Sequence, residues 1–195
     1  MLEKLLISPG AMKAGTTWLY EQLRTHPDIR FTPIKEIQYF SHINGLGHTL
    51  DHKQRLEKLD RVIVKGGREG RVKWYTKYAL PEELDDTWYC SLFGDVPQKV
   101  YCADFSNQYS LLPETSLEQI QKIAKDVKVI YTLRDPLARL WSHVKYHYKF
   151  VGKEDRVDNI SVPEFNGIIN KIWFWNNVDY VSNYDRLVNV FGKKM

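Results

Sequence analysis

Short apolar runs and amphipathic segments alternate along this chain, and this order predicts strands alternating with helices. The runs that predict strands cover residues 4–8, 30–32, 99–104 and 127–133. The last of them is rich in β-branched residues, as expected of a buried strand. Helical spacing appears in residues 16–25, 115–125, 137–150 and 177–191. This alternation predicts a single α/β domain over residues 1–195, with a central parallel sheet and helices on both faces.

Polar residues at fixed offsets mark the expected helix ends. Thr115-Ser116-Leu117-Glu118 offers a capping box for the helix over 115–125, and Ser161-Val162-Pro163-Glu164 starts a further helix in the same way. Gly192 is expected to stop the last helix.

Residues 42–73 show the weakest periodicity, and we expect an irregular insertion or lid there that receives a substrate. Basic side chains in this stretch suit either an anionic substrate or a solvated loop; they are Lys65, Arg68, Arg71 and Lys73. The same region holds the histidines His42, His48 and His52. Their spacing matches no metal-ligand pattern, so no metal site is predicted.

A glycine-rich loop, Gly10–Trp18, follows the first predicted strand and opens the first predicted helix. Glycine permits tight turns and close approach to a ligand. The first amides of a helix lack intrahelical partners and lie at the positive end of its dipole. The loop therefore predicts a phosphate cradle, although an ordinary strand-to-helix turn has the same outline. Both glycines of a Walker A motif are present, but Thr16 replaces its lysine and Lys13 lies inside the loop.

A second candidate phosphate site begins where the strand over 127–133 ends. The segment runs Arg134-Asp-Pro-Leu-Ala-Arg-Leu-Trp-Ser142, with Pro136 suited to the first helical position. Arg134 stands at the carboxyl end of a strand, where open α/β sheets bind ligands, and offers a planar fork of donors. The alternative is local: Arg139 pairs with Asp135 one turn back, and Ser142 is a surface residue.

Together the two motifs resemble those of sulfotransferases that use 3′-phosphoadenosine 5′-phosphosulfate (PAPS) and release adenosine 3′,5′-bisphosphate (PAP). The resemblance implies a three-layer fold like that of P-loop proteins. It also implies that Arg134 and Ser142 bind the 3′-phosphate of the donor. The loop residues that the resemblance assigns to the 5′ end of the donor are Lys13, Ala14, Gly15, Thr16 and Thr17.

Lys35-Glu36-Ile37-Gln38-Tyr39-Phe40 resembles a segment of heparan-sulfate-type and related bacterial sulfotransferases, in which the glutamate is the proposed general base. Glu36 matches that glutamate, and its alternative role is an ion pair with Lys35. Trp74-Tyr75 resembles a later segment of the same family, whereas residues 103–109 match poorly. Residues 100–113 contain no histidine that could serve as the base, which leaves Asp104 as an outside candidate.

Trp18 completes a K-x-G-T-T-W run that resembles cytosolic sulfotransferases, where this tryptophan stacks on the adenine of the donor. Alternatively, the Trp18 side chain packs in the hydrophobic core. The resemblance further implies that Lys13 contacts the oxygen bridging sulfate and phosphate, and that no metal is needed. The expected acceptor group is a hydroxyl, or in second place an amine, and the resemblance leaves open whether it belongs to a glycan or to a small hydrophobic molecule such as an alcohol. The rival functions are a small-molecule kinase and a non-catalytic nucleotide-binding module.

Composition narrows these possibilities only slightly. The 195 residues carry a net charge of +4, which suits an anionic donor but is too small to indicate nucleic-acid binding. The two cysteines, Cys90 and Cys102, predict neither a disulfide framework nor a metal site. No signal peptide or apolar run of membrane-spanning length is seen, so we expect a cytoplasmic enzyme without a membrane partner. The resemblance implies a further strand and donor loop after Phe191, so the chain is either naturally short or truncated.

Overall fold

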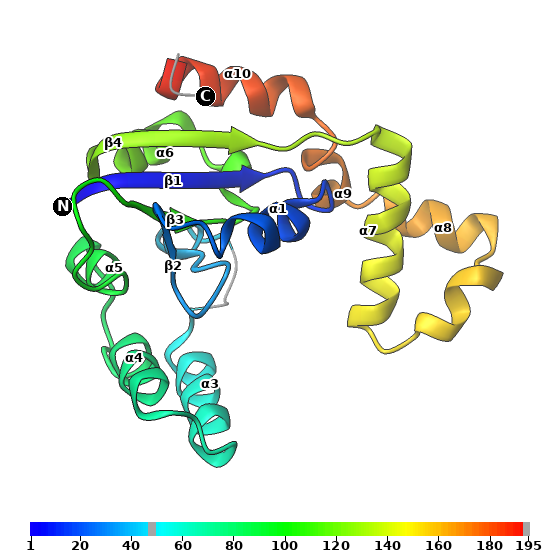
Figure 1. Cartoon of the computed structure of the whole chain (residues 1–195). Coiled ribbons are helices and arrows are strands. Elements are labelled where there is room, and N and C mark those ends of the chain that lie inside the picture. Colours follow the sequence, from blue (N-terminus) through cyan, green and yellow to red (C-terminus); the bar gives the residue numbers. More distant parts are fainter. Residues whose placement is uncertain (47–49, 193–195) are drawn as a thin grey trace.

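The computed structural model describes residues 1–46 and 50–192 and shows a parallel sheet flanked by helices (Figure 1). The strands are β1 (Leu2–Gly10), β2 (Ile29–Phe31), β3 (Tyr101–Asp104) and β4 (Ala124–Tyr131). The helices of the first half are α1 (Thr16–Leu23), α2 (Tyr39–Ile43), α3 (His52–Val64), α4 (Glu69–Ala79) and α5 (Asp86–Ser91). Those of the second half are α6 (Glu114–Lys122), α7 (Pro136–Phe150), α8 (Val162–Ile169), α9 (Ile172–Asn176) and α10 (Tyr180–Phe191). Short 3₁₀ turns cover Tyr109–Leu111 and Glu154–Asn159.

In the described part of the chain the four strands form one sheet in the order β2-β3-β1-β4. All three pairings are parallel, with Leu5 of β1 opposite both Cys102 of β3 and Val127 of β4. The predicted parallel α/β sheet is thus confirmed. Because the strands are parallel, the carboxyl ends of β1, β3 and β4 meet at one edge, and the segments that follow them lie close together.

Successive residues of β1 point to opposite faces of the sheet, as the pleat requires. Leu5 and Ile7 belong to the main hydrophobic core, which also contains buried residues of α5, α6 and α10. Leu6 faces the other way, in a smaller core with Phe105 that the side chains of α1 cover. Helices therefore lie on both faces, and Figure 1 shows α6 and α10 beside β4.

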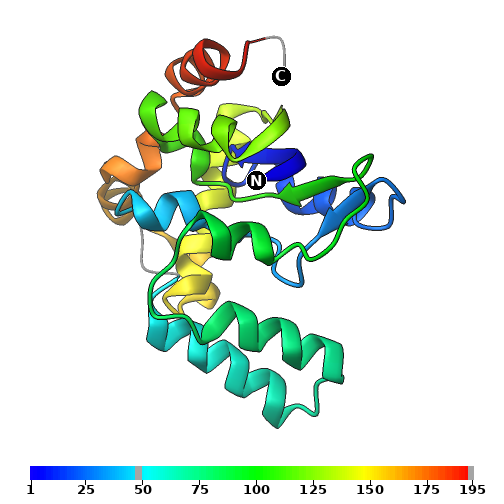
Figure 2. The same cartoon turned by 90° about the vertical axis from the view of Figure 1, so that its left-hand side faces the viewer.

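The expectation of irregular structure over 42–73 was wrong for most of that range. It contains α3 and the first part of α4, which run side by side (Figure 2). Arg55, Leu59 and Val62 of α3 share one buried face, and Arg55 donates hydrogen bonds to the carbonyls of Tyr78 and Ala79.

 The buried face of α3 is narrow and lies among charged residues. The sequence of this helix therefore shows only a weak helical periodicity of apolar positions. The role of this region as a lid or substrate-binding insertion stays a prediction.

The sequence predicts no metal site at His42, His48 and His52, and the structure describes only His42 and His52 of these three. His48 lies outside the described residues. Over residues 1–46 and 50–192, no group of three or more His, Cys, Asp or Glu side chains could hold a metal ion. In the same residues no helix is long and apolar enough to cross a membrane.

Several predicted element ends move by a few residues. The helix expected from Thr115 starts at Glu114, directly after Pro113, and has no side-chain cap. Ser116, expected in a capping box, instead donates a hydrogen bond to Asn44. The last helix begins at Tyr180 rather than 177. By contrast, the Ser161 hydroxyl does accept a bond from the Glu164 amide and caps α8, as predicted.

The helices α7, α8 and α9 form a separate lobe beyond the carboxyl edge of the sheet (Figure 1). Its own small core consists of Val144, Tyr148, Ile168 and Phe174. α7 begins immediately after the segment that follows β4. The lobe therefore faces the loop after β1 and completes one wall of the site described next.

Candidate functional site

A cavity of about 340 Å³ opens at the carboxyl edge of the sheet, between the ends of β1 and β4. Its lining brings together residues from both predicted phosphate motifs and from the segment after β2. These residues are Met12, Lys13, Gly15, Thr16, Thr17, Lys35, Glu36, Asn107, Arg134, Ser142 and Tyr146. A wider groove of about 860 Å³ beside β2 is lined by none of the predicted donor-binding or catalytic residues, although Arg71 of the basic stretch contributes to it.

The loop after β1 holds a backbone shape that its sequence explains only in part. Gly15 precedes α1 with φ of 95°, a left-handed conformation that glycine adopts without steric cost. Lys13 also has a positive φ, 68°, which is unusual for a residue with a side chain. Two arginines from the second motif contact this strained turn, because Arg139 donates to the carbonyl of Met12 and Arg134 to that of Lys13, each at 3.4 Å.

The side chain of Lys13 points into a cluster of positive charge. Its ammonium nitrogen lies 4.6 Å from the ring centre of Tyr146 on α7. Burial, followed by the charges of Lys35 and Arg134, lowers the pKa of Lys13 below its usual value. Glu36 contributes the one carboxylate of the lining, against the three cations. The cavity therefore favours a ligand with more than one negative charge.

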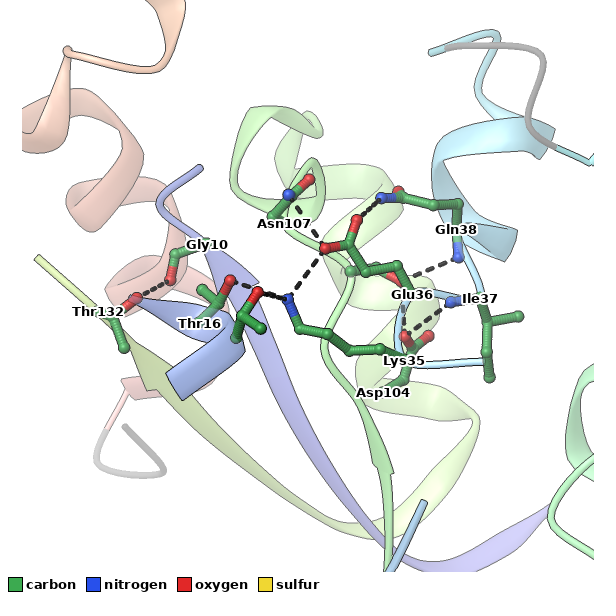
Figure 3. A network of polar contacts seen from close by, with 11 residues as sticks. Gly10, Thr16, Lys35, Glu36, Ile37, Gln38, Asp104, Asn107 and Thr132 are labelled. Atoms are coloured by element: carbon green, nitrogen blue, oxygen red, sulfur yellow. Dashed lines mark hydrogen bonds and ion pairs between the residues drawn. The ribbon is translucent and has the colours of Figure 1, made fainter. Parts of the chain in front are cut away.

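Polar contacts from three directions hold the carboxylate of Glu36 in place (Figure 3). Lys35 forms an ion pair with Oε1 at 3.1 Å, and the Asn107 amide donates to the same oxygen at 3.2 Å. The side-chain amide of Gln38 donates to Oε2 at 3.1 Å. The local ion pair with Lys35 that the sequence offered as an alternative is thus present, and it lies inside the cavity.

Asp104, the outside candidate for a base, lies elsewhere. Its carboxylate is fully buried below the segment that carries Glu36 and does not line the cavity. It accepts hydrogen bonds from the Ile37 amide and from the hydroxyls of Tyr89, Ser106 and Tyr109. Burial raises its pKa to about 6, although these donors oppose the shift. The contacts give Asp104 a structural place, in which it fixes the chain next to Glu36.

The second motif divides into residues that face the cavity and residues that support it. Arg134 and Ser142 line the cavity. Asp135 caps α7 by accepting from the Ala138 amide at 2.8 Å. Arg139 does not pair with that aspartate: its guanidinium is fully buried and also donates to the carbonyl of Phe174.

A histidine next to Arg139 is held in its neutral form. His143 stacks on the ring of Phe174 with 4.0 Å between ring centres, and its Nδ1 lies 3.4 Å from the guanidinium of Arg139. Burial, and then the charge of Arg139, lowers the pKa of His143 to about 4. An uncharged ring can share this buried space with the arginine at little electrostatic cost.

Two predicted donor-binding residues do not line the cavity. Trp18 is 68 % exposed on α1, and Ala14 is buried with its amide bonded to the Ala11 carbonyl. Sequence reasoning in turn missed four lining residues, Met12, Lys35, Asn107 and Tyr146, as parts of the site. Lys35 was visible only as a neighbour of Glu36, and Asn107 falls in a segment that matched the family pattern poorly.

Comparison with known proteins identifies the family and the fold. The family model described as "Sulfotransferase domain" matches residues 3–191. Among solved structures, the crystal structure of a sulfotransferase from Alicyclobacillus acidocaldarius is similar, with a TM-score of 0.61 and 21% sequence identity. The match covers 99% of this chain and 71% of that one, and it supports the fold. No curated protein matches the chain.

Proposed function

This chain belongs to the sulfotransferase family, and we propose that it transfers a sulfuryl group from PAPS to an acceptor hydroxyl, or in second place to an amine. The observation that carries the proposal is the cavity at the end of β1 and β4. It combines the N-terminus of α1, three cations and a single held carboxylate. That combination suits a donor with several phosphate and sulfate charges beside one proton acceptor.

The proposed donor contacts follow from where each group lies. The amides of Gly15, Thr16 and Thr17, with the threonine hydroxyls, suit the 5′-phosphate at the positive end of α1. Arg134 and Ser142 suit the 3′-phosphate, since both face the same cavity from the β4 side. Trp18 is proposed to stack on adenine from the rim, where its exposed indole is accessible.

The reaction then needs positioning and charge stabilisation, as phosphoryl transfer does. The acceptor oxygen attacks sulfur while the bond from sulfur to the phosphate oxygen breaks, and PAP leaves with that electron pair. Glu36 takes the acceptor proton. Lys13 contacts the bridging oxygen and offsets the charge that develops on it. We propose a glycan or a small hydrophobic alcohol as the acceptor, and no metal ion in the reaction.

Calorimetric titration with PAP, and with ATP in the presence and absence of magnesium, tests the proposal. We expect PAP to bind, and Arg134→Ala to weaken its binding about tenfold or more through loss of a charge-assisted contact. Arg156→Ala is the matched control, because Arg156 is an exposed arginine outside the cavity lining. Binding of magnesium-ATP alone would instead favour a kinase. PAP binding without turnover on any acceptor would favour a nucleotide-binding module.

A further inference from the structure

Lys35 connects the two halves of the cavity. Its side chain is only 17% exposed, and its ammonium nitrogen lies 3.1 Å from each of three oxygens (Figure 3). Two of them are the hydroxyls of Thr16 and Thr17, at the start of α1. The third is Oε1 of Glu36, in the segment after β2. A single ammonium group therefore lies between the proposed phosphate cradle and the proposed base.

We propose that Lys35 contacts the oxygens of the transferred sulfuryl group and stabilises their charge during transfer. This inference rests on the proposed function. The sulfur has to pass from the phosphate at the α1 N-terminus to an acceptor oxygen next to Glu36. The Lys35 ammonium already touches both ends of that path, so it lies beside the group that moves along it.

The chemistry at this position suits lysine. Negative charge is spread over the sulfuryl oxygens while the acceptor bond forms and the phosphate bond breaks. An ammonium group offers three donors that rotate freely, and it can exchange one oxygen partner for another. Lys35 keeps its proton throughout the step, because the acceptor proton passes to Glu36 and the electron pair leaves with PAP.

Lys35 differs in this respect from Lys13. Lys13 lies in the phosphate loop, where Arg134 contacts the Lys13 carbonyl, and it is the lysine proposed to contact the leaving oxygen. Lys35 instead donates to the hydroxyl oxygens of Thr16 and Thr17 and to the carboxylate of Glu36. PAP contains both phosphates but no sulfuryl group. A comparison of PAP and PAPS affinities therefore distinguishes a contact to phosphate from a contact to the sulfuryl oxygens.

The test measures the dissociation constants of PAP and PAPS for the wild type and for Lys35→Met, Lys35→Arg and Lys73→Met. In Lys35→Met we expect PAP affinity to stay within about threefold, while PAPS affinity falls about tenfold or more through loss of a charge-assisted hydrogen bond. Lys35→Arg retains the charge and should recover part of the PAPS affinity. Lys73→Met removes an exposed lysine of α4 and should change neither constant.

The other outcomes overturn the inference. Equal loss of PAP and PAPS affinity in Lys35→Met would assign the lysine to the phosphates or to the shape of the loop. Unchanged affinity for both would exclude a contact with the sulfuryl group in the bound donor. Failure of the wild type to bind PAP would overturn the proposed function itself, which separates that failure from a failure of the role of Lys35.

Discussion

The hydroxyl of Tyr109 donates a 2.8 Å hydrogen bond to the carboxylate of Asp104, and both side chains are fully buried. Tyr109 follows β3 and Asp104 ends it, so the bond closes a tight turn at the carboxyl edge of the sheet. The other oxygen of Asp104 accepts from the Ile37 amide. Asp104 therefore anchors the segment that carries Glu36. Within residues 1–46 and 50–192 no cation contacts its carboxylate, so burial of this charge has a cost in stability.

That cost predicts how stability depends on pH. The pKa of Asp104 is raised from 3.8 to about 6, so the folded state binds this proton more tightly than the unfolded state. Its contribution to stability is fully present below the unfolded value and is lost as the pH rises through about 6. The change in this contribution between pH 4 and 7 corresponds to roughly 2 kcal/mol.

Urea denaturation of the wild type and Asp104→Asn at several pH values measures this effect. We expect the difference between their unfolding free energies to shift in favour of the variant as the pH rises from 4 to 7. Exposed carboxylates contribute equally to both proteins and cancel in the difference. A difference that stays constant over this range would show that Asp104 titrates normally.

Arg139 is predicted to support donor binding from outside the cavity. It bonds to the carbonyls of Met12 and Phe174 and so connects the phosphate loop to the α7–α9 lobe. Arg139→Met should weaken PAP binding about tenfold and lower the unfolding free energy by about 1–3 kcal/mol, because buried carbonyls lose their donors. Calorimetry and urea denaturation measure the two effects.

Arg55→Met provides the control for Arg139. Arg55 is equally buried and also donates to backbone carbonyls, but it joins α3 to α4 away from the cavity. The Arg55→Met variant should have a lower unfolding free energy than the wild type and the same PAP affinity. If both variants bind PAP as tightly as the wild type, Arg139 has a purely structural role.

The parts of the site that the sequence predicted are those fixed by local motifs and sheet topology. Lys13 and Arg134 follow strands that were correctly expected to be parallel, and parallel strands place such residues at one edge. The contacts among Lys35, Glu36 and Asn107 depend on how separate segments pack, which a single sequence does not specify. The helix hairpin around Arg55 was missed for the same reason, since its buried face is defined by its partner helix.

The lowered pKa of Lys13 predicts that donor binding weakens at alkaline pH. Burial and neighbouring cations make its ammonium group lose the proton at a lower pH than a free lysine does. PAP affinity should therefore fall as the pH is raised from 7 toward 10. Lys13→Arg stays charged over this range and should show a smaller fall, measured by calorimetry at matched ionic strength. Identical pH profiles for the two proteins would remove Lys13 from the phosphate site.

Glu36 is predicted to act in proton transfer and not in donor binding. Glu36→Gln keeps the size of the side chain and an oxygen for the Asn107 and Lys35 contacts, so PAP affinity should change little. PAP formation from PAPS in the presence of acceptors should fall about 10²-fold or more, the usual scale for loss of a general base. Glu118→Gln, an exposed change on α6, is the control. Unchanged turnover in Glu36→Gln would require a different base.

Trp18 offers a direct optical test of where the adenine lies. Its indole is 68% exposed, so a stacked base should cover it and quench its fluorescence. We expect PAP to quench the wild type, and Trp18→Ala to lose that change together with about tenfold in affinity, which is the lower range for stacking on a base. Trp173→Ala removes another half-exposed tryptophan, in α9, and should retain both the quenching and the affinity. If Trp18→Ala binds PAP as the wild type does, the adenine is held elsewhere. The exposed indole then belongs to another surface of the protein, and the similarity of its motif to cytosolic sulfotransferases does not extend to base stacking.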